Sequence, residues 1–373
     1  MTPRTLSVLA LGGDGIGPEL VEEGVRLLEH VCTDNEIAVS IQRDLLHGQC
    51  YEIHGTFCRD ETVESAKKVD AVLVGAVGAP QYDGLFPGAE PTVRDGLMRL
   101  RKELDLFAGI RPVRSYDSVR DSAPFREPVI RGCNIVVLRE LTGGTFFSEP
   151  RGIETGTAGR IAVDTTRYSE FEIERHLRIG FQLAQRRSRR LVSVDKANVM
   201  ETGVLWREIS HEVAADFPDV EFGTMYADNC AYQLAVAPQQ FDVVVTDNLF
   251  GDILSDQAAS IAGSLGMLPS ASLPLLAPEG EVTRPGIYEP VHGSAPDLVG
   301  TGSANPVAMI LSVAMLLEFA AGRPDAAKEI ETAVEASLKA GVRTPDLGGT
   351  ANMSEVVDDV IGRWSNQRVS ADG

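Results

Sequence analysis

Short apolar runs alternate along the chain with amphipathic segments of helical spacing. Each apolar run ends in glycine or polar residues, as buried strands do where they leave a sheet. The pattern predicts strands at 6–13, 69–78, 134–141, 190–198 and 241–248, and helices at 18–31, 95–107 and 170–188. This alternation of strands and helices is typical of an α/β fold with a largely parallel sheet.

Two segments depart from this pattern. Residues 148–169 are rich in glycine and threonine, and we expect them to form a protruding hairpin arm. Residues 306–320 are strongly apolar but shorter than the about 18 residues that span a membrane, so they predict a buried or interface helix.

Charge and cysteine content narrow the class of protein. The net charge of −20 over 373 residues argues against nucleic acid or a membrane as partner, because both reward a basic surface. The five cysteines form no CxxC pair, which indicates reduced thiols. The N-terminus lacks the apolar core of a signal peptide. We therefore expect a cytoplasmic protein.

The glycine-rich segment "GGDGIGPE" (12–19) follows a predicted strand and opens a predicted helix. It does not fit the Rossmann fingerprint, since Pro18 stands where the third glycine should be. A tight turn between strand and helix is the better interpretation.

Asp252 and Asp256 in "FGDILSD" are four residues apart, so on a helix they share one face. One interpretation makes Asp252 an N-terminal residue that complements the helix dipole. Alternatively, both carboxylates bind Mg²⁺ or Mn²⁺, which prefer oxygen ligands. Asp228 in "MYADNCAYQ" is a candidate third ligand.

Basic residues lie at the ends of predicted elements. Arg101, Arg111 and Arg139 suggest a fork for a dicarboxylate, since guanidinium binds carboxylate through two hydrogen bonds. Lys196 ends an apolar strand, where partial burial could make it a base. The simpler alternative is an ion pair between Lys196 and Asp195.

The loop "YEPVHGSAPDLVGTGSANP" (288–306) offers backbone amides to an anion, and Asp297 could accept hydrogen bonds from two ribose hydroxyls. An ordinary connecting loop would have the same composition.

Seven motifs occur in order along nearly the whole chain. They are "GDGIGPE", "RELTGG", "EPRG", "SVDKANV", "FGDILSD", "LPSASL" and "EPVHGSAPD". Together they resemble the isopropylmalate dehydrogenase branch of the β-decarboxylating hydroxyacid dehydrogenases. The resemblance implies a two-domain α/β fold with largely parallel sheets that is not a Rossmann fold. It places 1–107 with 262–373 in the first domain and 108–261 in the second, and implies a homodimer with shared active sites.

The resemblance also implies residue roles. Arg101, Arg111 and Arg139 would hold the malate carboxylates, and Asp252 and Asp256 would bind metal together with Asp228 of the other subunit. Lys196 would be the base, supplied across the interface. The adenosine site would comprise His292, Gly293, Ser294, Ala295, Pro296, Asp297, Leu298 and Asn305. Because an acidic residue at 297 would repel a 2′-phosphate, NAD is expected rather than NADP.

The implied reaction is the NAD-dependent, metal-assisted oxidative decarboxylation of 3-isopropylmalate to 4-methyl-2-oxopentanoate, a step of leucine biosynthesis.

The chain departs from the family pattern at three positions. Phe146 stands where the family has a tyrosine proton donor, for which Tyr168 and Tyr226 are possible substitutes. Arg94 occupies a position that is acidic in the family, ahead of Leu97 and Met98, which would suit an apolar substituent on the malate. Asp247 replaces a small residue.

These departures keep two alternatives open. The first is a paralogue that acts on another 3-substituted malate, since Arg94 could favour a polar or anionic substituent. The second is a binding homologue that has lost catalytic power with its proton donor.

Overall fold

One twisted sheet runs through the whole molecule in the computed structural model, which describes residues 5–371. The order of its ten strands is β2-β1-β3-β12-β11-β4-β5-β10-β8-β9. The strands are β1 Leu6–Gly13, β2 Val39–Asp44, β3 Ala71–Ala76, β4 Ala108–Arg114, β5 Asn134–Glu140, β8 Arg190–Asp195, β9 Glu221–Tyr226, β10 Val243–Thr246, β11 Pro269–Leu273 and β12 Gly286–Pro290. The five predicted strands are therefore confirmed as β1, β3, β5, β8 and β10, and β2, β4, β9, β11 and β12 join them.

The sheet is mostly parallel, as predicted. Six neighbouring pairs are parallel, and only the pairs β12–β11, β11–β4 and β4–β5 are antiparallel. The predicted boundary between the two domains would fall between β11 and β4. Three residue pairs of the sheet join these two strands. The division itself stays a prediction.

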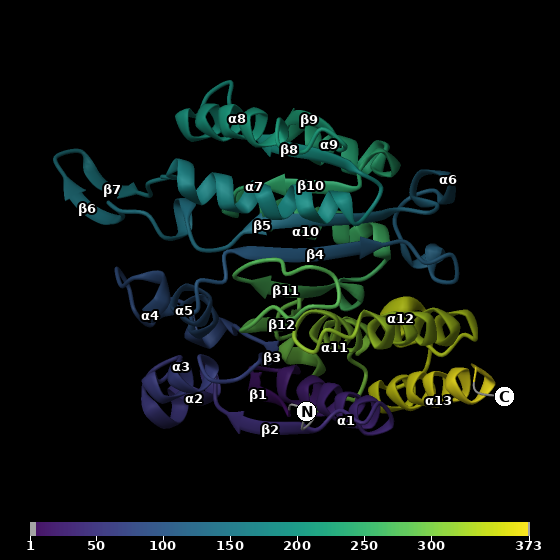
Figure 1. The fold of residues 1–373 in the computed structure, drawn as a ribbon. Helices are drawn as coiled ribbons and strands as arrows, with labels where there is room; N and C mark the ends of the chain where they lie inside the picture. Colours follow the sequence, from purple (N-terminus) through teal and green to yellow (C-terminus); the bar gives the residue numbers. More distant parts are fainter. Residues whose placement is uncertain (1–4, 372–373) are drawn as a thin grey trace.

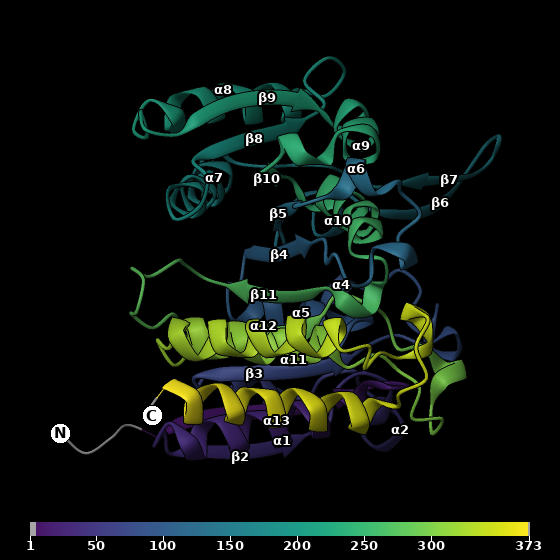
Figure 2. The same ribbon diagram turned by 90° about the vertical axis from the view of Figure 1, so that its right-hand side faces the viewer.

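Helices cover both faces of the sheet (Figures 1 and 2). The longer ones are α1 Gly17–Asp34, α5 Gly96–Glu103, α7 Glu170–Gln185, α8 Glu201–Ala214, α9 Ala227–Val236, α10 Asn248–Ala262, α11 Val307–Phe319, α12 Pro324–Lys339 and α13 Met353–Ala371. Short helices are α2 Gly48–His54, α3 Asp60–Ala66, α4 Pro91–Arg94 and α6 Glu127–Ile130. Strand β1 shows the two-sided burial, because Val8 and Ala10 join one apolar cluster whereas Leu9 and Leu11 join another. Burial on both faces explains the continuous apolar runs.

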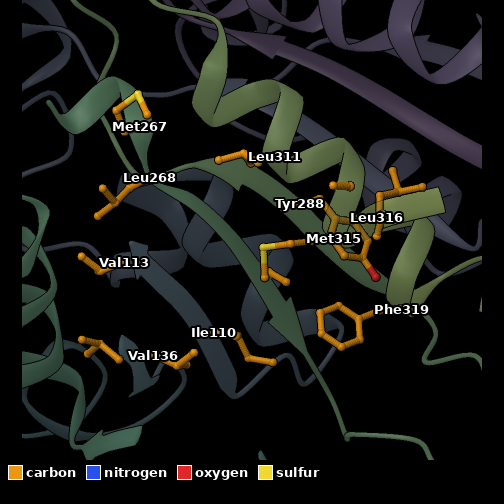
Figure 3. Packing of buried hydrophobic residues seen from close by; sticks show 14 of the residues in the cluster. Ile110, Val113, Val136, Met267, Leu268, Tyr288, Leu311, Met315, Leu316 and Phe319 are labelled. Carbon is orange, nitrogen blue, oxygen red and sulfur yellow. The ribbon is translucent and has the colours of Figure 1, made fainter. Parts of the chain in front are cut away.

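Part of the larger core lies between α11 and the middle of the sheet. Figure 3 shows Leu311, Met315 and Phe319 of α11 facing Ile110 of β4 and Tyr288 of β12. All five side chains are buried. The apolar run at 306–320 is thus a buried helix, as predicted. Within residues 5–371, no helix is both long and apolar enough to cross a membrane.

Two local predictions are confirmed. Gly13 and Gly15 adopt φ of 74° and 54° between β1 and α1, so this segment is a tight turn that requires glycine. Strands β6 Gly152–Gly156 and β7 Gly159–Val163 pair as an antiparallel hairpin that projects from the body of the molecule (Figure 1).

Candidate active site

Three buried arginines converge from neighbouring elements of the sheet. Arg101 lies on α5, Arg111 on β4 and Arg139 on β5. Arg101 donates a 2.7 Å hydrogen bond to Glu289, and Arg111 donates one of 2.6 Å to Ser255. The predicted fork of arginines is therefore present as a cluster in one chain.

The electrostatics of this cluster favour a bound anion. Burial lowers the pKa of Arg139 to about 9, and the neighbouring guanidinium of Arg111 adds to this effect. Burial and the charge of Arg101 lower the pKa of Arg111 in the same way. Desolvated positive charges that repel one another are stabilised by a dianionic ligand, which removes both penalties.

Asp252 and Asp256 lie one turn apart on α10, with partly exposed carboxylates that face the arginines. Arg111 lies 3.8 Å from Asp252 and 3.9 Å from Asp256, and Arg139 donates a hydrogen bond to Asp252. Burial raises the pKa of Asp256, and the charge of Asp252 contributes to this shift. The helix approaches Arg139 closely because Gly251 lacks a Cβ, which would lie 2.6 Å from the Arg139 side chain.

The helix-dipole interpretation of Asp252 is wrong. Helix α10 begins at Asn248, and its N-cap is Asp247, whose carboxylate accepts a 2.8 Å hydrogen bond from the backbone of Phe250. Asp252 therefore lies beyond the first turn, where a carboxylate gains little from the helix dipole.

Lys196 follows β8 and pairs with Asp228 on α9, at 2.5 Å between Nζ and Oδ1. The alternative pairing with Asp195 is wrong, because Arg207 binds Asp195 through two hydrogen bonds of 2.9 and 2.8 Å. The hydrogen bond from Lys196 lowers the pKa of Asp228, which keeps this carboxylate ionised. Tyr226 lies beside the pair, with its ring centre 5.9 Å from the lysine nitrogen.

The donor set fits a hard divalent cation only in part. Asp252 and Asp256 present oxygen atoms one turn apart, as Mg²⁺ and Mn²⁺ prefer. Yet nowhere in the described part of the chain do three histidine, cysteine or carboxylate groups gather to hold an ion. Asp228 is engaged with Lys196, so a complete site requires donors from outside this chain or from the substrate.

The side chain of Phe146 has no hydroxyl group and cannot donate a proton. The ring of Phe146 lies against Arg139 instead. Of the two possible substitutes, Tyr168 is buried, with its hydroxyl 3.2 Å from Glu140 and 3.0 Å from the backbone nitrogen of Asn248. Tyr226 is partly exposed next to Lys196, so it is the more accessible of the two phenols.

The candidate cofactor loop follows β12 and packs on the turn between β1 and α1. The backbone carbonyl of Ser294 accepts a 2.9 Å hydrogen bond from Ile16, and Gly300 donates one of 2.8 Å to Glu19. His292, Gly293, Ala295, Pro296 and Leu298 lie along the same loop. Asp297 is exposed, so its carboxylate is free to accept hydrogen bonds. Asn305 is buried and bonded to Asp346, which anchors the end of the loop.

The substituent helix α5 begins after Asp95, which caps it by accepting hydrogen bonds from Leu97 and Met98 at 2.7 and 2.9 Å. Leu97 is buried, Met98 is half-buried and Arg94 is exposed at the end of α4. Met98 and Arg101 are three residues apart and therefore lie on one face of the helix.

Several supporting residues did not emerge from the sequence. Glu289 binds Arg101, Ser255 binds Arg111, and Asn248 accepts hydrogen bonds from Arg139 at 2.8 and 3.0 Å. One signal was available, because an acidic residue inside the apolar run "GIYEP" must find a partner when it is buried.

The chain matches the family model described as isocitrate/isopropylmalate dehydrogenase over residues 7–360. It is 49% identical over 356 residues to the 3-isopropylmalate dehydrogenase of Ruegeria pomeroyi, covering 95% of this chain and 96% of that protein. Identity to the enzyme of the same name from Xanthomonas campestris is 47%, with 94% and 98% covered. Among solved structures, the isocitrate dehydrogenase from Methylococcus capsulatus superposes with a TM-score of 0.84 at 32% identity, with 96% and 99% covered.

Proposed function

The chain belongs to the isocitrate/isopropylmalate dehydrogenase family, and from this premise we propose that it oxidises and decarboxylates 3-isopropylmalate with NAD⁺, giving 4-methyl-2-oxopentanoate. This reaction is a step of leucine biosynthesis. The observation that carries the proposal is the cluster of three buried guanidiniums beside two aspartates on α10.

The substrate carboxylates would bind Arg101, Arg111 and Arg139. Binding would compensate the buried positive charge and leave the hydroxyl carbon next to α10. Asp252 at present accepts a hydrogen bond from Arg139, and a substrate carboxylate would replace it there. The freed aspartate could then turn to a metal ion.

Asp252 and Asp256 would hold Mg²⁺ or Mn²⁺ together with the partner subunit's Asp228. When bound, the cation supplies positive charge against the oxygen that becomes negative during oxidation and decarboxylation. Members of this family use NAD and such a divalent metal. The exposed position of Asp228 supports a donor that acts outside its own chain.

Lys196 would accept the hydroxyl proton while the hydride leaves for NAD⁺. Over the whole reaction the dianionic substrate and NAD⁺ become a monoanionic keto acid, CO₂ and NADH, so no proton is gained or lost. The proton taken from the hydroxyl is thus equivalent to the one returned to the substrate carbon after CO₂ departs. With Phe146 unable to donate, the return falls to Lys196 itself, to Tyr226 beside it, or to water.

We further propose a homodimer with shared sites. Exposed apolar side chains lie on α9, on α10 and on the hairpin β6–β7; they include Tyr232, Val236, Ile253, Ile153 and Ile161. Helices α9 and α10 contact each other, and exposed apolar side chains on neighbouring helices and on a projecting hairpin are typical of an interface between subunits. The predicted cytoplasmic location remains a prediction.

The cofactor would bind the loop from His292 to Asn305, with its ribose hydroxyls on Asp297. The loop is anchored at Ser294 and Asn305, which leaves its exposed central residues in a defined position. An anchored loop lowers the entropy lost when a ligand binds.

The test is a spectrophotometric assay of NAD⁺ reduction with 3-isopropylmalate, with Mg²⁺ or Mn²⁺ added after complete chelation. We expect turnover that disappears on chelation and returns with either metal. Turnover that is unaffected by chelation would contradict the proposal. Absence of turnover with every metal would instead favour a binding homologue that lost its proton donor.

A further inference from the structure

A pocket of about 280 Å³ opens next to the arginine cluster, between α4–α5 and the loop that holds Phe146. Met98 and Phe146 line the pocket, and each lies next to one of the arginines. Met98 precedes Arg101 by three residues on α5, and the ring of Phe146 packs against Arg139. Two lining residues thus neighbour the arginines, which places the pocket on the side of α5 where the substituent of a bound malate could point.

Aromatic rings form the far wall of this pocket. Phe57, Tyr82 and Phe86 line it and pack edge to face, with ring centres 5.9 Å apart for Phe57–Tyr82 and 5.6 Å for Phe57–Phe86. Their interplanar angles of 78° and 88° mean that the rings stand nearly perpendicular to each other, edge against face. Such mutually packed rings form a rigid wall, because each ring fixes its neighbour.

His47 completes the wall in an unusual backbone conformation. Its φ of 55° and ψ of −126° lie where residues with a Cβ are rarely found. Its ring stacks on Phe57 at 4.3 Å, and its Nδ1 lies 2.6 Å from the Asp14 carboxylate. Asp14 is itself fixed by hydrogen bonds of 2.8 Å from the backbone nitrogens of Gly48 and Gly78. Strain of this kind persists where the side chain has a role that glycine could not fill.

Arg94 lies at the rim of the pocket without a partner. Among the described residues, no carboxylate or carbonyl accepts a hydrogen bond from its guanidinium, and its side chain is exposed. Two carboxylates, Asp83 and Asp95, also line the pocket. The lining thus combines aromatic rings with charges of both signs, and its two cations are Arg94 and Arg151.

We propose that this pocket receives the 3-substituent of the malate and favours an aromatic one; this inference rests on the proposed function. An isopropyl group has three carbon atoms and leaves most of the pocket empty, whereas a benzyl group fills more of it. Its ring would meet the edges of Phe57, Tyr82 and Phe86, and ring edges pair well with ring faces. The Met98 sulfur and the Arg94 guanidinium both bind favourably to aromatic rings.

A carboxylate-bearing substituent fits this lining less well. It would gain from Arg94 but would approach Asp83 and Asp95 at the same time. Arg151, the second cation of the lining, already donates a 2.7 Å hydrogen bond to the Phe146 carbonyl and lies 3.8 Å from Asp164. Such a substituent would also leave the aromatic wall in contact with a solvated charge, which costs desolvation free energy. 3-Isopropylmalate remains a substrate under this inference, bound by the same arginines but with a partly empty pocket.

The first test is a calorimetric measurement of Kd, in the presence of Mg²⁺ and without NAD⁺. Three probes share the malate core: 3-isopropylmalate, 3-benzylmalate and 3-(2-carboxyethyl)malate. We expect 3-benzylmalate to bind about tenfold more tightly than 3-isopropylmalate, the scale of a few added apolar contacts in a pocket. Equal or weaker binding of 3-benzylmalate, or tightest binding of the carboxyethyl compound, would overturn the inference.

A variant that fills the pocket gives the second test. Leu85 lines the pocket and is 38% exposed, so Leu85→Trp adds volume there with little risk to folding. Leu275→Trp is the matched control, since Leu275 is also exposed and lies outside the pocket. We expect Leu85→Trp alone to weaken 3-benzylmalate binding about tenfold more than it weakens 3-isopropylmalate binding, because the larger substituent reaches further into the pocket. An equal loss for both ligands would place the substituent elsewhere.

Two further variants test the pocket without added volume, in case Leu85→Trp disrupts folding. Phe86→Ala removes one ring of the wall, and His47→Gly removes another while relieving the strained backbone. Both should reduce the ratio of the two Kd values toward one. A ratio that stays at the wild-type value in both variants would overturn the aromatic wall as its cause.

Competition and turnover separate the remaining outcomes. If NADH and 3-benzylmalate excluded each other, the pocket would belong to the nicotinamide ring and the inference would fail. NAD⁺ reduction with 3-isopropylmalate but no preference for 3-benzylmalate would keep the proposed function and reject this inference. Preferential binding of 3-benzylmalate without any NAD⁺ reduction would keep this inference about the pocket and reject the proposed function.

Discussion

The guanidinium carbon of Arg139 lies 5.6 Å from the centre of the Phe146 ring. A substrate held by Arg139 would therefore contact a ring that has no hydroxyl. If the return of the proton limits the rate, Phe146→Tyr should raise kcat, because a positioned acid typically contributes about 10²–10⁴-fold. The measurement is kcat for NAD⁺ reduction, with the solvent isotope effect expected to fall as protonation ceases to limit.

The control for this change is Phe147→Tyr. Phe147 is adjacent in sequence but lies under Lys102, with the nitrogen 5.3 Å from the ring centre. This variant should leave kcat near its wild-type value. An unchanged or lower kcat in Phe146→Tyr, with correct folding, would show that the proton reaches the substrate by another route that the phenol does not improve.

Shared active sites predict complementation between inactive variants. Lys196→Met removes the proposed base, and Asp252→Asn removes a proposed metal ligand that would act in the other site. Each variant alone should lose nearly all activity. After the two are mixed and their subunits exchanged, about a quarter of wild-type activity should return, since half of the dimers are mixed and each has one intact site.

The return of activity can be checked against a pair of variants that should not complement each other. Asp252 and Asp256 of one chain would serve the same site, so a dimer of Asp252→Asn with Asp256→Asn has a defect in both of its sites. Activity that returned equally in both mixtures, or in neither, would contradict sharing across the interface. Native mass spectrometry of the mixtures, with one variant of each pair labelled with nitrogen-15, confirms that exchange has taken place.

The exposed carboxylate of Asp297 predicts cofactor preference. Asp297→Asn should lower kcat/KM for NAD⁺ by roughly tenfold, because hydrogen bonds to charged groups contribute about 1.5–3 kcal/mol. The value for NADP⁺ should stay the same or rise, since repulsion of the 2′-phosphate is removed. Asp216→Asn serves as control, because this exposed aspartate pairs with Arg178 of α7, outside the loop. An equal loss for both cofactors would indicate a structural role instead.

The buried cap Asp247 predicts a pH-dependent stability. Burial raises the pKa of Asp247 to about 7, well above its ordinary value of 3.8. The folded protein therefore holds a proton that the unfolded chain has lost, so this stabilisation is complete below about pH 4 and disappears as pH rises through about 7. Asp247→Asn keeps a cap acceptor but does not ionise.

The free energy of unfolding of Asp247→Asn, measured by urea denaturation, should therefore rise relative to wild type between pH 5 and pH 8. The expected gain is on the order of 1–3 kcal/mol, because each unit of pKa shift corresponds to about 1.4 kcal/mol and the wild-type carboxyl titrates over about two units of this pH range. A constant difference across this range would show that the carboxylate is ionised at both pH values.

The sequence by itself determined the order and type of most elements. The apolar runs of β1, β3, β5, β8 and β10 and the periodic helices α1 and α7 are local patterns, and local propensity and burial on two faces act within each segment. The tight turn at Gly13 and Gly15 followed from the same local reasoning. The motifs likewise indicated which arginines, aspartates and lysine to examine, because reactive groups at strand ends are visible in the chain order.

Only the tertiary structure decided which of these groups meet. Arg101 lies 188 residues from Glu289, and Arg139 lies 109 residues from Asn248, so their contacts depend on the strand order of the sheet. Helix α10 begins at Asn248 after its cap Asp247, so Asp252 lies beyond the first turn, and Lys196 pairs with Asp228 because Arg207 occupies Asp195. The aromatic pocket around His47 has no sequence signature at all, since it arises where four separate segments close around one space.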